Sequence, residues 1–198
     1  MDTILVPVLL FAISMSITPG PNNMLLTASG ATYGYRRTVP LICGIVAGIV
    51  SLLTLSALGL GTLFESVPLL RTILKIAGSV YLVYLAFRIA FSDAKTSGGA
   101  SRERPLSFLE GAAFQYLNPK AYVMTITAMS VYPLSGSAYL PSAALIVAVF
   151  IAVTPISISL WAGFGTLLGT LMTSPRSARA VRLSLGALTL GSVVFVAV

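Results

Sequence analysis

Long apolar runs separated by short polar segments dominate this 198-residue chain. Crossing a hydrocarbon core of about 30 Å takes about 20 apolar residues in a helix, and each run comes close to or exceeds that length. The pattern therefore predicts an all-α membrane protein with six transmembrane helices. The expected spans cover residues 4–33, 40–63, 69–90, 107–132, 142–168 and 180–198.

Composition supports an integral membrane protein. Hydrophobic residues make up 57% of the chain and charged residues 9%, whereas charged residues are about a quarter of a soluble domain. The net charge of +7 comes from basic residues in short loops, so we expect a lipid bilayer and no nucleic acid as partner. Asp2 stands where a signal peptide needs a basic residue, so the first run is expected to remain as a span.

The loop charges predict an orientation. If loops alternate between the two sides of the membrane, nine of the twelve basic residues fall on one side, and that side is then cytoplasmic. Arg71 and Lys75 fall on the other side, and both termini are expected outside. The nine are Arg36, Arg37, Arg88, Lys95, Arg102, Arg104, Arg176, Arg179 and Arg182.

A polar linker at 92–105 divides the chain into halves of three spans, 1–91 and 106–198. Because three is odd, two halves of the same fold must insert upside down relative to each other, as in many secondary transporters. An offset of 100 residues pairs Pro19 with Pro119 and places a proline motif inside the first helix of each half. The sequence therefore predicts two inverted three-helix repeats.

The first span is interrupted by the stretch ITPGPNNM at 17–24. Proline at 19 and 21 removes two backbone donors, so the span should break there, with Gly20 allowing the turn. Unpaired backbone groups are tolerated in a membrane only where they face protein or a wet cavity. Asn22 and Asn23 follow the break at a helix start that favours an anion such as a carboxylate, although they could instead bridge helices structurally.

The fourth span carries a similar break at Asn118-Pro119-Lys120, with Tyr116 and Tyr122 on either side. Lys120 lies near the middle of its span, where an ionised side chain costs roughly 2.5–3.5 kcal/mol, which makes it a candidate for substrate binding. Two alternatives remain open: Lys120 could snorkel, or it could cap carbonyls freed by the first break. The two tyrosines could contact substrate or could simply be packed.

The remaining chemistry is sparse. The chain has no histidine and one cysteine, so we expect neither a metal site nor a cofactor, and no set of groups predicts an enzyme. Glu110, at the entrance of the fourth span, could take part in proton coupling or could be a boundary carboxylate paired with Arg102 or Arg104. Trp161 is expected in an interfacial aromatic belt.

The stretch TPGPNNMLLTASGATYGYRRTVPLICGIVAG closely resembles the first signature of the LysE/RhtB family of amino-acid exporters. GAAFQYLNPKAYVMTITA is similar to the second signature of that family, and KIAGSVYLVYLAFRIA to its third span. The resemblance covers nearly the whole chain, and its N-terminal half is most similar to the cysteine/O-acetylserine branch. It implies a bacterial inner-membrane carrier, a homodimer that exports amino acids with the proton gradient. The site residues it carries over are Pro19, Gly20, Pro21, Asn22, Asn23, Asn118, Pro119 and Lys120.

Together these observations predict alternating access around a central site built from both breaks. A small neutral amino acid is the expected substrate, because no embedded acid is available to meet a cationic side chain. A passive channel or a membrane scaffold without coupled transport is the alternative.

Overall fold

The computed structural model describes residues 2–91 and 104–193, and this part of the chain contains helices and no strand. The first half holds α1 (Asp2–Ile17), α2 (Pro21–Tyr33), α3 (Tyr35–Ala57), α4 (Leu60–Ser66) and α5 (Pro68–Phe91). The second half holds α6 (Phe108–Gln115), α7 (Pro119–Val131), the 3₁₀ turn η1 (Gly136–Ala138), α8 (Tyr139–Thr170) and α9 (Pro175–Gly191).

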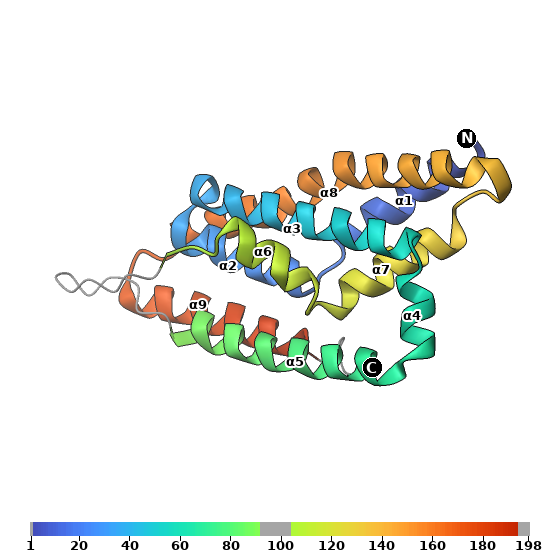
Figure 1. Ribbon diagram of the computed structural model, residues 1–198. Helices are drawn as coiled ribbons and strands as arrows, with labels where there is room; N and C mark the ends of the chain where they lie inside the picture. Colours follow the sequence, from blue (N-terminus) through green and yellow to red (C-terminus); the bar gives the residue numbers. More distant parts are fainter. Residues whose placement is uncertain (1, 92–103, 194–198) are drawn as a thin grey trace.

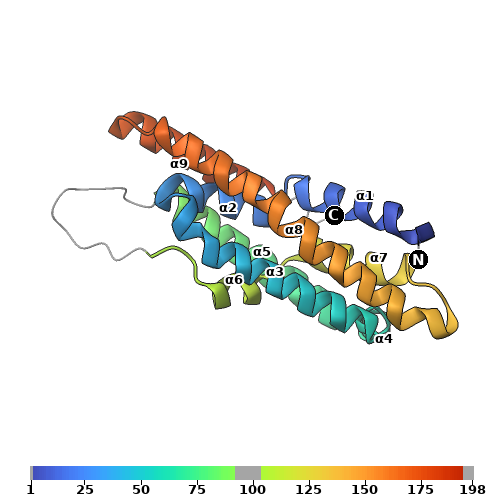
Figure 2. The same cartoon turned by 90° about the horizontal axis from the view of Figure 1, so that it is seen from above.

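The long helices lie along one axis of an elongated bundle (Figure 1). The starts of α1 and α8 lie at the end of the bundle that carries α4. The end of α2, the end of α5 and the start of α9 lie at the opposite end. In the view of Figure 2, α8 runs the length of the bundle and passes both α1 and α2, against which it packs.

Three helices are long and apolar enough to cross a membrane: α3, α5 and α8. A fourth span follows if α1 and α2, which bend by 54° at their break, are counted as one. By length and composition the described chain thus has three or four candidate spans and is a membrane protein. Within the described residues α6, α7 and α9 have 8, 13 and 17 residues, so the six spans stay a prediction.

The loop assignment of several basic residues was wrong. Arg176, Arg179 and Arg182 lie inside α9, because Ser174 forms a capping box with Ser177 and starts the helix at Pro175. Arg36 and Arg37 likewise lie in the first turn of α3. Arg71 and Lys75, assigned to a loop on the other side, lie inside α5, which begins at Pro68.

Small residues let the helices approach closely. A Cβ added at Gly165 of α8 would lie 2.1 Å from the Thr27 carbonyl oxygen of α2, and one at Gly44 of α3 would lie 2.1 Å from the Phe108 carbonyl oxygen of α6. Backbone-to-backbone contact of this kind excludes any side chain larger than hydrogen. These contacts fix α2 on α8 and α6 on α3, and they hold the two helix breaks in place.

The buried core lies between these helices and is largely aliphatic, with Phe114 and Phe150 as its largest side chains. The outer faces are also apolar; on α5, for example, Leu69, Val80 and Phe91 are exposed. A soluble protein rarely exposes so large an apolar surface, whereas a lipid-facing helix does.

Candidate functional site

The first span is broken as predicted: α1 ends at Ile17 and α2 begins at Pro21. The expected role of Gly20 was wrong in one respect, because its φ of −177° and ψ of −179° are extended values open to any residue. The space around Gly20 explains the residue better. A Cβ there would lie 2.9 Å from Lys120 Cδ and 3.2 Å from Lys120 Nζ, so glycine leaves room for the lysine.

The carbonyls freed at this break are bound by side chains. Asn23 Nδ2 donates to the Thr18 carbonyl at 2.8 Å and to the Ser16 carbonyl at 3.2 Å. Trp161 Nε1 donates to the Ile17 carbonyl at 3.2 Å, so the indole lies at the break; its place in an interfacial belt stays a prediction. Because buried carbonyls without partners are costly, these donors make the interrupted backbone tolerable.

The second break separates α6, which ends at Gln115, from α7, which begins at Pro119. Asn118 is the N-cap of α7, and its side-chain oxygen accepts from the Lys120 backbone N–H at 3.2 Å. Gly78 of α5 faces this break: a Cβ there would lie 1.9 Å from the Leu117 carbonyl oxygen. Helix α5 therefore packs directly against the second break.

The two breaks meet. Lys120 Nζ donates to the Thr18 carbonyl at 2.6 Å and lies 3.5 Å from the Pro19 carbonyl oxygen. Asn22 and Gln115 form a reciprocal amide pair, with both N–H···O distances at 2.9 Å. Gln115 is fully buried, and the sequence analysis missed it. An amide three residues before a predicted break in an apolar run was the signal that could have found it.

A cavity with an empty volume of about 340 Å³ lies between the breaks. The predicted residues Gly20, Asn22, Asn23, Asn118 and Lys120 line it. The rest of its wall comes from Met15, Ser16, Ile49, Ala121, Met124, Thr154 and Ile158.

Asn118 supplies the clearest unmet hydrogen-bonding group in this cavity. Its side chain is 1% exposed, and its Nδ2 has no hydrogen-bond partner among the described residues. The oxygen of the same amide is already used as the cap of α7, so the nitrogen is the free end. A buried donor without a partner costs about 1–3 kcal/mol, and a bound acceptor would recover that cost.

The other predicted site residues lie beside the cavity and do not line it. Pro19, Pro21 and Pro119 shape the two breaks. Tyr122 Oη donates to the Tyr116 carbonyl, and the Tyr116 hydroxyl is hydrogen-bonded to the Ser51 hydroxyl at 2.7 Å. Both tyrosines thus hold the second break in its conformation.

Glu110 also lies outside the cavity. It closes a capping box with Ser107 at the start of α6 and binds Arg104 through two contacts of 2.6 and 3.2 Å. This hydrogen bond with Glu110 raises the pKa of Arg104. The pair is one of the two boundary ion pairs considered from the sequence; Arg102, in the other, lies outside the described residues. Among the described residues no group of three or more His, Cys, Asp or Glu could hold a metal ion.

Comparison with known proteins decides the family. The LysE type translocator profile matches residues 13–198. The chain belongs to the LysE type translocator family. Relatives of this LysE type chain include the proteins named cysteine/O-acetylserine efflux protein from Escherichia coli (strain K12) and Shigella sonnei (strain Ss046), each 32% identical over 124 residues. That match spans 63% of this chain and 63% of each relative's length, and no solved structure gives a significant match.

Proposed function

We propose that this chain is a secondary transporter that exports small amino acids or their derivatives across the bacterial inner membrane. Its membership of the LysE type translocator family supports transport, and relatives named for cysteine and O-acetylserine efflux support this class of substrate. The cavity between the two helix breaks is the proposed substrate site.

The observation that carries the proposal is the pairing of an unused donor with a cation in one cavity. Asn118 Nδ2 and Lys120 Nζ both come from the start of α7 and both line the space between the breaks. A carboxylate accepts hydrogen bonds from both kinds of donor, and bonds to charged groups are the stronger ones. In the proposal Asn118 and Lys120 hold the substrate carboxylate, and Lys120 exchanges its bond to Thr18 for one to the substrate.

The remaining walls favour a small neutral side chain. Met15, Ile49, Met124 and Ile158 supply apolar surface. The Ser16 and Thr154 hydroxyls, 3.5 Å apart, supply the polar groups near them. None of the described residues that line this cavity is acidic, so none of them would compensate a cationic side chain.

Alternating access by two inverted repeats, residues 1–91 and 106–198 joined by 92–105, is the proposed mechanism. The packing supports it: α1 and α2 contact α8, while α6 and α7 contact α3, and α5 contacts α9. If α1 is exchanged with α6, α2 with α7, α3 with α8 and α5 with α9, the same set of contacts results. A two-fold axis in the membrane plane requires this. The Lys120–Thr18 and Asn22–Gln115 bonds cross between the halves and would break and re-form as they rock.

The proposal includes a proton-driven homodimer with both termini outside. The positive-inside rule supports the orientation, because α3 has Arg36 and Arg37 in its first turn and α5 has Arg88 in its last turn, and these helix ends lie at the end of the bundle where α2 ends (Figure 1). Arg104 is hydrogen-bonded to Arg88 through its carbonyl. Those residues would face the cytoplasm.

Counterflow in sealed liposomes tests the function. Purified protein is reconstituted with unlabelled O-acetyl-L-serine inside, and uptake of labelled O-acetyl-L-serine is followed at two pH values. A carrier gives saturable uptake stimulated by internal substrate, and Lys120→Met should abolish it, whereas Lys75→Met, outside the cavity, should not. Repeating the assay with a panel of amino acids tests whether a related amino acid is the substrate instead. Equilibration without stimulation for every amino acid would establish a passive channel instead.

A further inference from the structure

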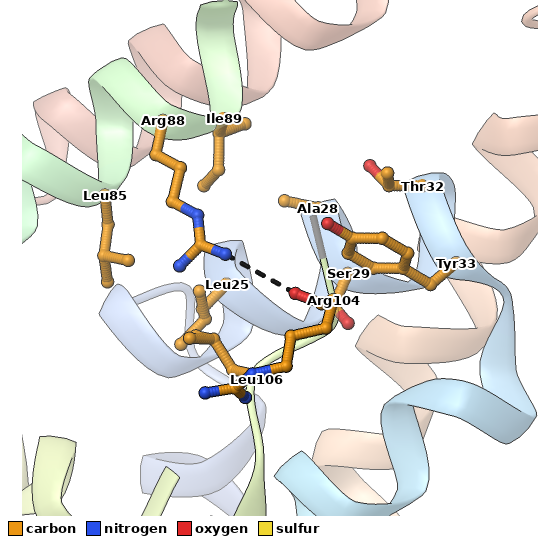
Figure 3. A pocket seen from close by; sticks show the side chains of 10 residues that line it. All are labelled: Leu25, Ala28, Ser29, Thr32, Tyr33, Leu85, Arg88, Ile89, Arg104 and Leu106. Carbon is orange, nitrogen blue, oxygen red and sulfur yellow. Dashed lines mark hydrogen bonds between the residues drawn. The ribbon is translucent and has the colours of Figure 1, made fainter. Parts of the chain in front are cut away.

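A second cavity lies along α2 on the far side of the breaks, toward the end where α2 and α5 terminate. It has an empty volume of about 440 Å³ and is shown in Figure 3. Its walls come from α2, α5 and the segment that precedes α6. They are formed by Leu25, Ala28, Ser29, Thr32, Tyr33, Leu85, Arg88, Ile89, Arg104 and Leu106.

Arg88 brings a positive charge into this cavity, and no described carboxylate is paired with it. Its Nη2 donates to the Arg104 backbone carbonyl at 3.4 Å, the contact drawn in Figure 3. Glu110 pairs with Arg104, and no carboxylate among the described residues forms a salt bridge with Arg88. A guanidinium presents its donors as a planar fork that matches the two oxygens of a carboxylate or phosphate.

The rest of the cavity suits an apolar group beside that charge. Leu25, Leu85 and Leu106 are buried and form apolar wall. The Ser29 hydroxyl is already hydrogen-bonded to the Thr38 hydroxyl at 2.9 Å, which leaves the exposed Thr32 as a hydroxyl at the rim.

Both cavities lie on the same helix. Asn22 lines the inner cavity, while Leu25, Ser29 and Thr32 line the outer one. Spacings of three and four residues place these positions on one face of α2. At 1.5 Å per residue, Asn22 and Thr32 are about 15 Å apart along that face.

We propose that the outer cavity is a second binding site for an oxyanion attached to an apolar group, in which Arg88 holds the oxyanion and the apolar wall contacts the carbon atoms next to it. Two sources share this chemistry: the carboxylate of an amino acid on its way to the inner site, and the phosphate of an anionic lipid. The carboxylate source rests on the proposed transport function. The phosphate source does not.

The test compares Arg88→Gln with Arg179→Gln. Both variants remove one positive charge, but Arg179 is exposed on α9 outside the cavity, near the same end of the bundle. Binding of O-acetyl-L-serine to purified protein in neutral detergent is measured by calorimetry, and phosphatidylglycerol retained after purification is counted by native mass spectrometry. A third variant, Thr32→Phe, narrows the mouth without changing charge.

Loss of one bound O-acetyl-L-serine, or its weakening by about tenfold or more, in Arg88→Gln and Thr32→Phe but not in Arg179→Gln supports the site with carboxylate as source. Loss of retained phosphatidylglycerol with the same selectivity supports it with phosphate as source. If neither ligand distinguishes Arg88→Gln from Arg179→Gln, the proposal is overturned. Failure of the transport function would show separately, as absent counterflow by the wild-type chain.

Discussion

Lys120 Nζ and the Thr18 carbonyl oxygen lie 2.6 Å apart, although the two residues are 102 positions apart in the sequence. This bond joins the start of α7 to the break between α1 and α2. One of the alternatives left open by the sequence, that Lys120 caps carbonyls freed at the first break, is therefore what the structure contains. It is compatible with substrate binding, because an ammonium has three donors and can exchange one partner for another.

Gly20→Ala tests the space left for Lys120. The extended backbone at Gly20 accepts alanine, but the new Cβ would lie 2.9 Å from Lys120 Cδ. We expect the flexible lysine to shift, so the protein should fold, while counterflow slows by about tenfold, the change that corresponds to 1.4 kcal/mol. Gly163→Ala is the control, because a Cβ there meets nothing within 4 Å. Equal counterflow by the two variants would contradict this role of Gly20.

The Asn22–Gln115 pair should behave as a coupled unit. Asn22→Ala leaves the buried Gln115 amide without its partner from the first half of the chain, and Gln115→Ala does the same to Asn22. We expect each change to cost about 1–3 kcal/mol of unfolding free energy. The double variant should be less destabilised than the sum of the single variants by about 1 kcal/mol, measured by unfolding in mixed detergent.

Asn22→Ala combined with Thr170→Ala provides the additivity control, since Thr170 lies at the end of α8 and donates to the Leu167 carbonyl. A strictly additive Asn22–Gln115 cycle would mean that the two amides contribute independently.

Gly78→Ala should damage the second break directly. Its Cβ would lie 1.9 Å from the Leu117 carbonyl oxygen, which is backbone and cannot swing aside as a side chain can. We expect a loss of about 1–3 kcal/mol in unfolding free energy together with reduced counterflow. Gly191→Ala, where a Cβ meets nothing within 4 Å, should lose neither. An unfolding free energy of Gly78→Ala equal to that of the wild-type protein would show that close contact between α5 and the second break does not contribute to stability.

Glu110→Gln separates a structural from a coupling role. The carboxylate accepts from the Ser107 backbone N–H at 2.7 Å and binds Arg104, and it lies outside the inner cavity. We expect a stability loss of at most about 1 kcal/mol. The rate and pH dependence of counterflow should be unchanged. Counterflow that no longer responds to pH would instead place Glu110 in proton coupling.

The sequence predicted the features that depend on local backbone chemistry. Proline lacks a backbone N–H, so the helix is interrupted near Pro19 and Pro119 regardless of which elements pack around these residues.

Features that depend on distant partners escaped prediction. Nothing in the sequence around Trp161 indicated that its indole donates to the Ile17 carbonyl at the first break. Gln115 acquires its role only through Asn22, 93 positions away. Hydropathy also misplaced the start of α9, because the cap at Ser174 begins the helix before the apolar run does. The local sequence pattern indicates where backbone carbonyls lose their helical hydrogen bonds. It does not indicate which distant side chains donate to those carbonyls.

The most direct test is substrate binding by Asn118→Asp. Aspartate is isosteric and keeps an oxygen to cap α7, so the fold should survive. It replaces the free amide donor in the cavity by a carboxylate that repels a bound carboxylate. The account predicts that equilibrium binding of labelled O-acetyl-L-serine to the inner site and counterflow are both lost. Wild-type affinity at that site in a folded Asn118→Asp protein would contradict it.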